Sequence, residues 1–374
     1  MNGALLVAAV VSLIIAAMNG SNDVSKSVAT LAGGGVAGYR RAILWGAVWT
    51  TVGSIASFGF AKAMVNTFGK GLLGSGIHPT FQAAIATILG AALWVGIATR
   101  VSLPVSTTHA IVGSLAGGRI RLRGRRNALE LLASKVALPL LLSPFASLIL
   151  TRLALIAWKS LSPQSQVDCL CTEVHARPAS FATATGPHLG VTSFPDIHVS
   201  VCRQRSGTTE DSTTFSLTVD GLHWLTSAAT SLARGLNDAP KMVALLISAS
   251  ALSGHVPSGS LWAFLLIATG ILAGSIFAGR RVTTVLGEGI TSMDHREGFV
   301  ANLITAALVG PGAALGLPMS TTHVASGAIV GIGTGRTEMN WMLREIALAW
   351  VVTIPTAALF GIVAFELLRL VHIG

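Results

Sequence analysis

Two short polar motifs occur twice in this apolar sequence, and both contain residues that can bind ions. The first motif, Gly-Ser-Asn-Asp at residues 20–23, returns as Gly-Leu-Asn-Asp at residues 235–238. Each copy is followed, three residues after its Asp, by a lysine, Lys26 or Lys241. Carboxylate and amide oxygens are ligands that hard cations prefer, and an ammonium group is a partner for anions. The motif therefore predicts an ion-binding site with two related halves.

The aspartates of this motif lie where few charges are tolerated. Asp23 and Asp238 each stand between two apolar runs separated by a glycine-containing break, which predicts a carboxylate near membrane depth at a helix break. An ionisable group there costs at least about 2.5 kcal/mol and persists where it faces a partner or a water-filled cavity. Both aspartates are therefore candidate site residues. The structural alternative is that each Asp only caps the half-helix that follows it.

The second motif, Leu-Pro-x-Ser-Thr-Thr-His, occupies residues 103–109 and returns 214 residues later at 317–323. Proline tends to begin a helix, whose first N–H groups are unpaired and carry a partial positive charge. Three adjacent hydroxyls at such a position predict an anion cradle. Its members are Ser106, Thr107 and Thr108 in the first copy and Ser320, Thr321 and Thr322 in the second. The structural alternative is that the hydroxyls cap the helix or bond back to its own carbonyls.

The histidines and lysines of these motifs allow more than one role. His109 and His323 follow Ser106 and Ser320 by three residues, but no acid lies close by in sequence to orient them, so we expect neither a serine nucleophile nor an enzyme. They are expected to be buried and bonded to backbone, or to relay protons. Lys26 and Lys241 can pair with the preceding Asp and partly replace a coupling cation, or present fixed positive charge to an anion. Alternatively, their stems extend toward the membrane surface.

The composition shows which elements must position these groups. Of 374 residues, 52% are hydrophobic and 11% charged, and the mean hydropathy is +0.69, which excludes an ordinary water-soluble domain. Apolar runs of membrane-crossing length predict an all-α, multi-pass integral membrane protein of about 10–12 membrane segments, in the plasma (inner) membrane if the source is bacterial. The net charge of +10 fits basic loops on one membrane face better than a nucleic-acid partner.

The chain is predicted to consist of two transmembrane repeats joined by a linker. Residues 1–158 form the first repeat and 221–374 the second, because both motifs occur in the same order in each. Residues 159–220 are polar and without sustained periodicity, which predicts an extramembrane linker that is partly disordered. Counting spans between the arginine clusters predicts that the repeats are inverted and use broken or re-entrant half-helices. Three cysteines in the linker indicate no function: Cys169, Cys171 and Cys202.

The four motif copies together resemble those of the inorganic phosphate transporter (PiT) family. The resemblance covers both halves of the chain but not the linker. It implies phosphate binding at both Ser-Thr-Thr triplets, and cation and phosphate binding, including possible sodium, at Asn22, Asp23, Asn237 and Asp238. It also implies a homodimer, and a coupling ion instead of a cofactor. Many members have Asn where this chain has Lys26, a difference that leaves proton, sodium or metal-phosphate coupling open.

The sequence thus predicts a secondary active symporter of inorganic phosphate, driven by a proton or sodium gradient. Sulfate or another tetrahedral oxyanion is the first alternative, because hydroxyls and carboxylates alone do not select phosphate from sulfate. Hydrogen phosphate can donate a proton to Asp23 or Asp238 and sulfate cannot, which favours phosphate. An ion channel is the alternative from a different functional class.

Overall fold

A computed structural model of the chain describes most of its residues in two separate units. The described residues are 3–68, 80–123, 138–161, 169–180, 191–202, 215–252, 261–288, 293–333, 340–341, 343–344 and 347–370. The first unit comprises residues 1–157 and 223–374, and the second comprises residues 158–222. The motifs found in the sequence all lie in the first unit.

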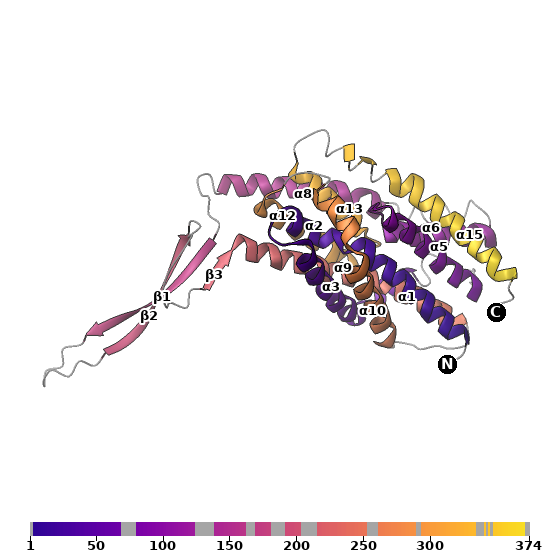
Figure 1. Cartoon of the computed structure of the whole chain (residues 1–374), viewed down its shortest axis with the longest axis horizontal. Helices are drawn as coiled ribbons and strands as arrows, with labels where there is room; N and C mark the ends of the chain where they lie inside the picture. Colours follow the sequence, from indigo (N-terminus) through magenta and orange to yellow (C-terminus); the bar gives the residue numbers. More distant parts are fainter. Residues whose placement is uncertain are drawn as a thin grey trace. The chain divides into compact units, whose positions relative to one another are not determined.

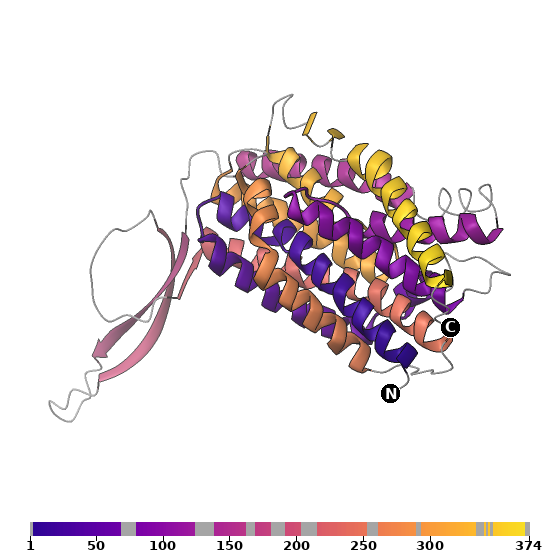
Figure 2. The ribbon, with the colours of Figure 1, turned by 45° about the vertical axis from the view of Figure 1, so that its right-hand side comes forward.

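The first unit is helical throughout its described part (Figure 1). Its first half contains α1 (Gly3–Asp23), α2 (Ser25–Gly33), α3 (Tyr39–Ala56), the 3₁₀ turn η1 (Ser57–Gly59), α4 (Lys62–Asn66), α5 (Phe81–Arg100), α6 (Thr107–Arg123) and α8 (Leu138–Leu161). Its second half contains α9 (Val219–Leu252), α10 (Leu261–Ala278), α11 (Arg280–Glu288), α12 (His295–Ala314), α13 (Thr321–Ile332), the π-helical segment η4 (Leu348–Thr353) and α15 (Ile354–Leu370). Figure 2 shows the long helices running alongside one another.

Seven helices of the described part are long and apolar enough to cross a membrane. They cover residues 3–33, 39–59, 81–100, 138–160, 261–278, 295–314 and 348–370. Large apolar side chains also remain exposed on them, such as Phe277 at 87% and Leu370 at 75%, as expected for surfaces whose solvent is lipid. The prediction of an integral membrane protein is confirmed, and its membrane unit is all-α in the described residues, whereas the inverted relation of the halves stays a prediction.

Small residues allow the helices of the two halves to approach closely. A methyl group added to Gly20 on α1 would lie 2.1 Å from the carbonyl oxygen of Ile271 on α10, and one added to Gly274 would lie 1.8 Å from that of Ala17. Such contacts replace the hydrophobic driving force that is missing between helices in lipid. They hold α1 against α10, so the motif at the end of α1 is fixed relative to the second half.

The second unit contains a three-stranded antiparallel sheet that the sequence did not predict. Its strands are β1 (Cys169–Ser180), β2 (Val191–Cys202) and β3 (Phe215–Thr218), in the order β2-β1-β3. The register places Cys169 opposite Cys202 on β2 and opposite Thr218 on β3. The prolines and the irregular polarity of this segment hid the strands, because they mask the two-residue alternation by which strands are recognised.

Candidate functional site

The first Asn-Asp motif lies at the junction of two helices, as predicted, but the second does not. Helix α1 ends at Asp23 and α2 begins at Ser25, and Val24 between them keeps helical dihedrals, so the two helices follow each other along residues 3–33 with a one-residue irregularity. Helix α9 instead runs without a break past Asp238, with Pro240 inside it. The predicted helix break at the second copy is therefore wrong. A proline removes one N–H from a helix and bends it, but the turns on either side can continue.

Both Ser-Thr-Thr-His segments begin a helix, as the preceding proline predicted. Helices α6 and α13 start at Thr107 and Thr321, each after a non-helical stretch of six residues, 101–106 and 315–320. Ser320 caps α13 by accepting a hydrogen bond from the His323 N–H at 3.2 Å, and Ser106 accepts one from the His109 N–H at 3.3 Å. The serines therefore do cap the helices, whereas most threonine hydroxyls bond elsewhere.

The two aspartates, which are 215 residues apart in sequence, lie at one buried site. Asp23 and Asp238 are 1% and 3% exposed. The side-chain amide of Asn19 reaches Oδ2 of both carboxylates, at 2.8 Å for Asp23 and 3.4 Å for Asp238, and Oγ1 of Thr107 at 3.2 Å. Thr107 itself donates to Asp23 at 3.1 Å. One amide group thus connects the acidic residues of both halves with the beginning of α6.

Each lysine forms an ion pair with its aspartate inside this site. Lys26 pairs with Asp23, and its ammonium also donates to Oδ1 of Asn22 at 2.7 Å, to the Asn22 carbonyl at 3.2 Å and to the Val105 carbonyl at 3.2 Å. Its ammonium therefore has four oxygen atoms around it. The alternative that the lysine stems extend to the membrane surface is wrong for Lys26, because its side chain is 2% exposed and its ammonium is bound to oxygens inside the site.

The second lysine has a similar environment that includes a residue of the first half. Lys241, 1% exposed, donates to Oγ1 of Thr108 at 2.8 Å, to the Met319 carbonyl at 2.9 Å and to Asp238 at 3.3 Å. Asn237 donates to the same carbonyl at 3.2 Å. Both lysines thus bind the carbonyl that directly precedes a capping serine, and both stems are buried.

Hydroxyls of the two helix starts bond across the interface between the halves. Thr108 donates to the Met319 carbonyl and Thr322 donates to the Val105 carbonyl, both at 3.1 Å, and Ser320 donates to Ser106 at 2.9 Å. Thr321 differs from its counterpart Thr107, because its hydroxyl makes no hydrogen bond within the described residues. The cradle predicted from the sequence therefore exists as two facing helix starts that are bonded to each other.

The two histidines lie together behind these serines. Their ring centroids are 4.6 Å apart, and both side chains are at most 1% exposed. Nδ1 of His109 is 2.8 Å from Oγ of Ser106, while Nδ1 of His323 donates to the Leu140 carbonyl at 3.3 Å. Nε2 of each ring has no partner among the described groups. The structure thus brings the histidines together and joins His109 to the serine pair.

Sequence reasoning missed three side chains that belong to this site. They are Asn19, Thr99, which accepts a hydrogen bond from Asn22 at 3.0 Å, and Arg234. Arg234 is a charged residue in an apolar run, four positions before Asp238, and it corresponds by the repeat offset to Asn19. That spacing on a helix was the signal that could have revealed it, because residues four apart share a face.

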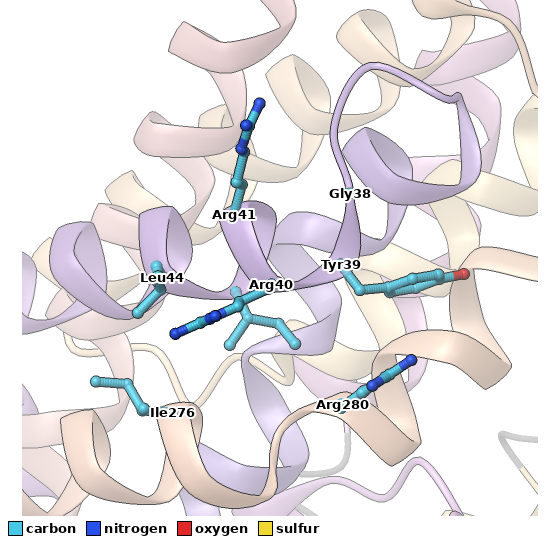
Figure 3. Close-up of a pocket in the computed structure, with 8 residues that line it drawn as sticks. Gly38, Tyr39, Arg40, Arg41, Leu44, Ile276 and Arg280 are labelled. Carbon is cyan, nitrogen blue, oxygen red and sulfur yellow. The ribbon is translucent and has the colours of Figure 1, made fainter.

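A large cavity elsewhere contains none of the predicted site residues (Figure 3). It has a volume of about 820 Å³ and is lined by Tyr39, Arg40 and Arg41 at the start of α3 and by Ile276 and Arg280 near the α10–α11 junction. These arginines belong to the clusters that the sequence assigns to basic loops. The motif residues instead form a closely packed cluster in the protein interior.

Comparison with known proteins agrees with the family resemblance of the motifs along nearly the whole chain. Residues 19–361 match the phosphate transporter family. The chain belongs to this family. Among similar members, a protein of Pyrococcus abyssi named as a phosphate permease is 26% identical over 404 residues, covering 98% of each chain. A Rhizobium meliloti protein named as a low-affinity inorganic phosphate transporter is 26% identical over 363 residues, covering 95% of this chain and 93% of that protein.

A solved structure shares the fold. A protein described as the sodium-dependent phosphate transporter superimposes with a TM-score of 0.75 at 22% identity, covering 99% of this chain and 100% of that one. Membership of the phosphate transporter family confirms the resemblance seen in the motifs and the prediction of a multi-pass membrane protein. It also confirms that the chain is a transporter and not an enzyme, so the Ser-His pairs are not nucleophiles.

Proposed function

We propose that this chain is a secondary active symporter of inorganic phosphate and that the buried cluster is its transport site. The observation that supports this is the meeting of four motif copies at one place. Both Asp-Lys pairs and both Ser-Thr-Thr helix starts contact one another there, through Asn19, Lys241 and the Ser106–Ser320 pair. In transporters built from two repeats, the substrate binds where such elements meet near the membrane midplane.

The chemistry of the cluster suits a tetrahedral oxyanion that carries a proton. Two ammonium groups, two helix N-termini and the hydroxyls beside them supply donors for anionic oxygens. Asp23 and Asp238 supply acceptors for a protonated oxygen, which phosphate carries at neutral pH and sulfate does not. The names of the relatives in Pyrococcus abyssi and Rhizobium meliloti support the same choice.

The hydrogen bonds between the two helix starts suggest how access alternates. Thr108 and Thr322 each donate to a carbonyl at the other helix start, and the two capping serines bond directly. We propose that phosphate takes over these donors and that separation of the helix starts opens the site to one side at a time. If the two halves are inverted repeats, the conformation that one half adopts in the inward-facing state would be adopted by the other half in the outward-facing state.

The coupling ion is proposed to be a proton. Sodium was a possible ligand of Asn22, Asp23, Asn237 and Asp238, and three of these residues, Asn22, Asp23 and Asp238, hold lysine ammonium groups instead. The Lys26 ammonium lies among four oxygens of Asn22, Asp23 and Val105, and the Lys241 ammonium lies among three. A tethered cation in each place makes a sodium ion unnecessary there. The carboxylates and the His109–His323 pair are then the candidate carriers of the proton.

Uptake of labelled phosphate into proteoliposomes tests the proposed function. We expect accumulation against a gradient when a proton gradient is imposed, and none with a sodium gradient alone. Arsenate should compete with phosphate and sulfate should not. Accumulation of sulfate without phosphate would show that the substrate is wrong, and equilibration without accumulation under either gradient would indicate a channel. Accumulation driven by sodium alone would contradict the proton coupling but not the substrate.

A homodimer is also proposed, on the family resemblance. The mass of the purified protein, measured with the detergent contribution subtracted, is expected to be twice that of the 38.4 kDa chain. A single chain per particle at all protein concentrations would contradict it.

A further inference from the structure

The guanidinium of Arg234 is buried without a hydrogen-bonding partner among the described residues. The side chain is 1% exposed, and Nε and both terminal nitrogens make no hydrogen bond to any described residue. Arginine carries five N–H donors and keeps its charge in proteins, and buried charges are normally paired. An unpaired buried charge is strongly destabilising. A residue of this kind indicates a ligand that completes its hydrogen bonds.

The position of Arg234 on α9 directs it to the transport site. Arg234, Asp238 and Lys241 are spaced by four and three residues, so they share one face of the helix. Asp238, one turn further along that face, is linked to Asp23 through the Asn19 side-chain amide. At the corresponding place in the first half, Asn19 contacts Asp23 and Thr107 directly. Arg234 therefore faces the cluster of both halves.

The buried charges of the site do not balance without an anion. Five Asp, Glu, Lys or Arg residues are buried within the described part of the chain: Asp23, Lys26, Arg234, Asp238 and Lys241. The two Asp-Lys ion pairs neutralise four of them. Arg234 remains as one uncompensated positive charge in an apolar surrounding. A monovalent anion such as dihydrogen phosphate would bring the net charge of the site to zero.

Other unsatisfied polar groups lie on α9 or on residues that contact α9 next to Arg234. Ser231 precedes it by three residues on α9, and its hydroxyl has no partner in the described structure; nor do the Thr50 hydroxyl and the Asn302 side-chain N–H₂. Thr50 lies against α9 at Gly235, and Asn302 accepts a hydrogen bond from Thr230 through its backbone carbonyl. These hydroxyl and amide groups can all donate to anionic oxygens.

We propose that Arg234 is an anion-binding residue that receives the transported phosphate one helical turn, about 6 Å along the α9 axis, from Asp238. The inference rests on the proposed function, because it assigns a further ligand to the same transport site. The planar guanidinium donates two parallel hydrogen bonds to two phosphate oxygens, a geometry that an ammonium cannot provide. The Thr321 hydroxyl at the beginning of α13, which also makes no hydrogen bond within the described structure, is a further candidate donor to the anion.

The test compares Arg234→Gln and Arg234→Lys with the wild-type protein and with Arg369→Gln as control. Arg369 is likewise an arginine within a long helix, α15, but its side chain is 59% exposed and pairs with Glu366. Two quantities are measured: the KM of phosphate uptake in proteoliposomes, and the melting temperature in detergent with and without inorganic phosphate. The second reports binding without transport.

We expect Arg234→Gln to raise the KM about tenfold to a hundredfold and to abolish the phosphate-induced rise in melting temperature. Its melting temperature without phosphate should equal or exceed that of wild type, because an unpaired buried charge is removed. Arg234→Lys should raise the KM less, since it keeps the positive charge but loses the two parallel N–H donors of the guanidinium. Arg369→Gln should match wild type in both measurements.

Several results would overturn the inference. A purely structural arginine predicts the reverse pattern, a lower melting temperature without phosphate and an unchanged phosphate shift and KM. If Arg234→Gln does not fold, the KM of Arg234→Lys decides: a wild-type value contradicts the proposal and a raised value supports it. Failure of both variants to fold also contradicts it. If wild type itself neither takes up phosphate nor is stabilised by it, the proposed function fails first.

Discussion

Replacing Lys26 with alanine tests whether a tethered ammonium stands in the place of a coupling sodium ion. The wild-type ammonium contacts Asp23, and also Oδ1 of Asn22 at 2.7 Å and the Asn22 and Val105 carbonyls at 3.2 Å each. Its removal leaves a buried carboxylate without its ion pair. Breaking a buried pair in this way costs about 3–5 kcal/mol. We therefore expect Lys26→Ala to be much less stable than wild type in a sodium-free buffer.

Sodium should restore part of that loss in the variant. The substitution leaves four oxygens, from Asn22, Asp23 and the Val105 carbonyl, around a space that the ammonium filled. A ligand present at about 100 times its Kd stabilises the folded state by about 2.7 kcal/mol. Sodium at that level should therefore restore about 2.7 kcal/mol of a stability loss whose lower limit is about 3 kcal/mol. Wild type should gain no stability from sodium because its site is already filled.

Thermal unfolding in detergent measures the effect, with sodium chloride and choline chloride compared at equal ionic strength. The matched control is Lys62→Ala, because Lys62 is an exposed lysine on the short helix α4. Phosphate uptake by Lys26→Ala should also acquire a dependence on sodium that wild type lacks. If the variant unfolds at the wild-type temperature in both salts, or if its uptake and ion dependence are unchanged, the coupling argument is wrong.

Three further predictions concern the rest of the protein. Asp238→Asn should reduce phosphate uptake at least tenfold at a normal expression level, because Lys241 loses its carboxylate partner; near-wild-type uptake would exclude Asp238 from the site. Gly274→Ala should destabilise the protein by about 1–3 kcal/mol, since its methyl group meets the Ala17 carbonyl oxygen, whereas Gly3→Ala, with open space around it, should unfold like wild type. Replacing residues 164–214 with a flexible Gly-Ser segment of about 15 residues should leave uptake intact, and loss of uptake in a correctly inserted variant would contradict a passive linker.

The parts of the site that sequence patterns predicted are those determined locally. A proline followed by a serine and two threonines specifies a helix start and its cap within six residues, and Thr107 and Thr321 begin helices as expected. The association of Asp23 with Asp238 could be predicted because the same motif occurs twice in an apolar chain. By contrast, the continuation of α9 past Pro240 depends on tertiary contacts. Asn237 and Lys241, for example, both bind the Met319 carbonyl.

Arg234 could not be interpreted from sequence for a different reason. The long stem of an arginine normally lets its charged end reach water, and only the three-dimensional packing shows that this one is enclosed and has no partner among the described residues. Its role as an anion ligand is inferred from the balance of buried charges in both halves, and no short segment of the sequence contains all of these residues. The β-strands of the linker were missed because their period is obscured by prolines and irregular polarity.

The repeated motifs suggest a symmetric site, yet the two halves differ where the anion is expected. In the first half, Asn19 and Thr107 both donate to Asp23 directly, so neither of these two donors is unused. In the second half, their counterparts Arg234 and the Thr321 hydroxyl make no hydrogen bond within the described structure, so both remain unused. Because the two helix starts are related by the repeat but the unused donors lie in the second half, the anion should bind closer to the second half. Phosphate binding should therefore depend more on Arg234 than on Asn19, and substitution of Asn19 should mainly lower the stability of the folded protein.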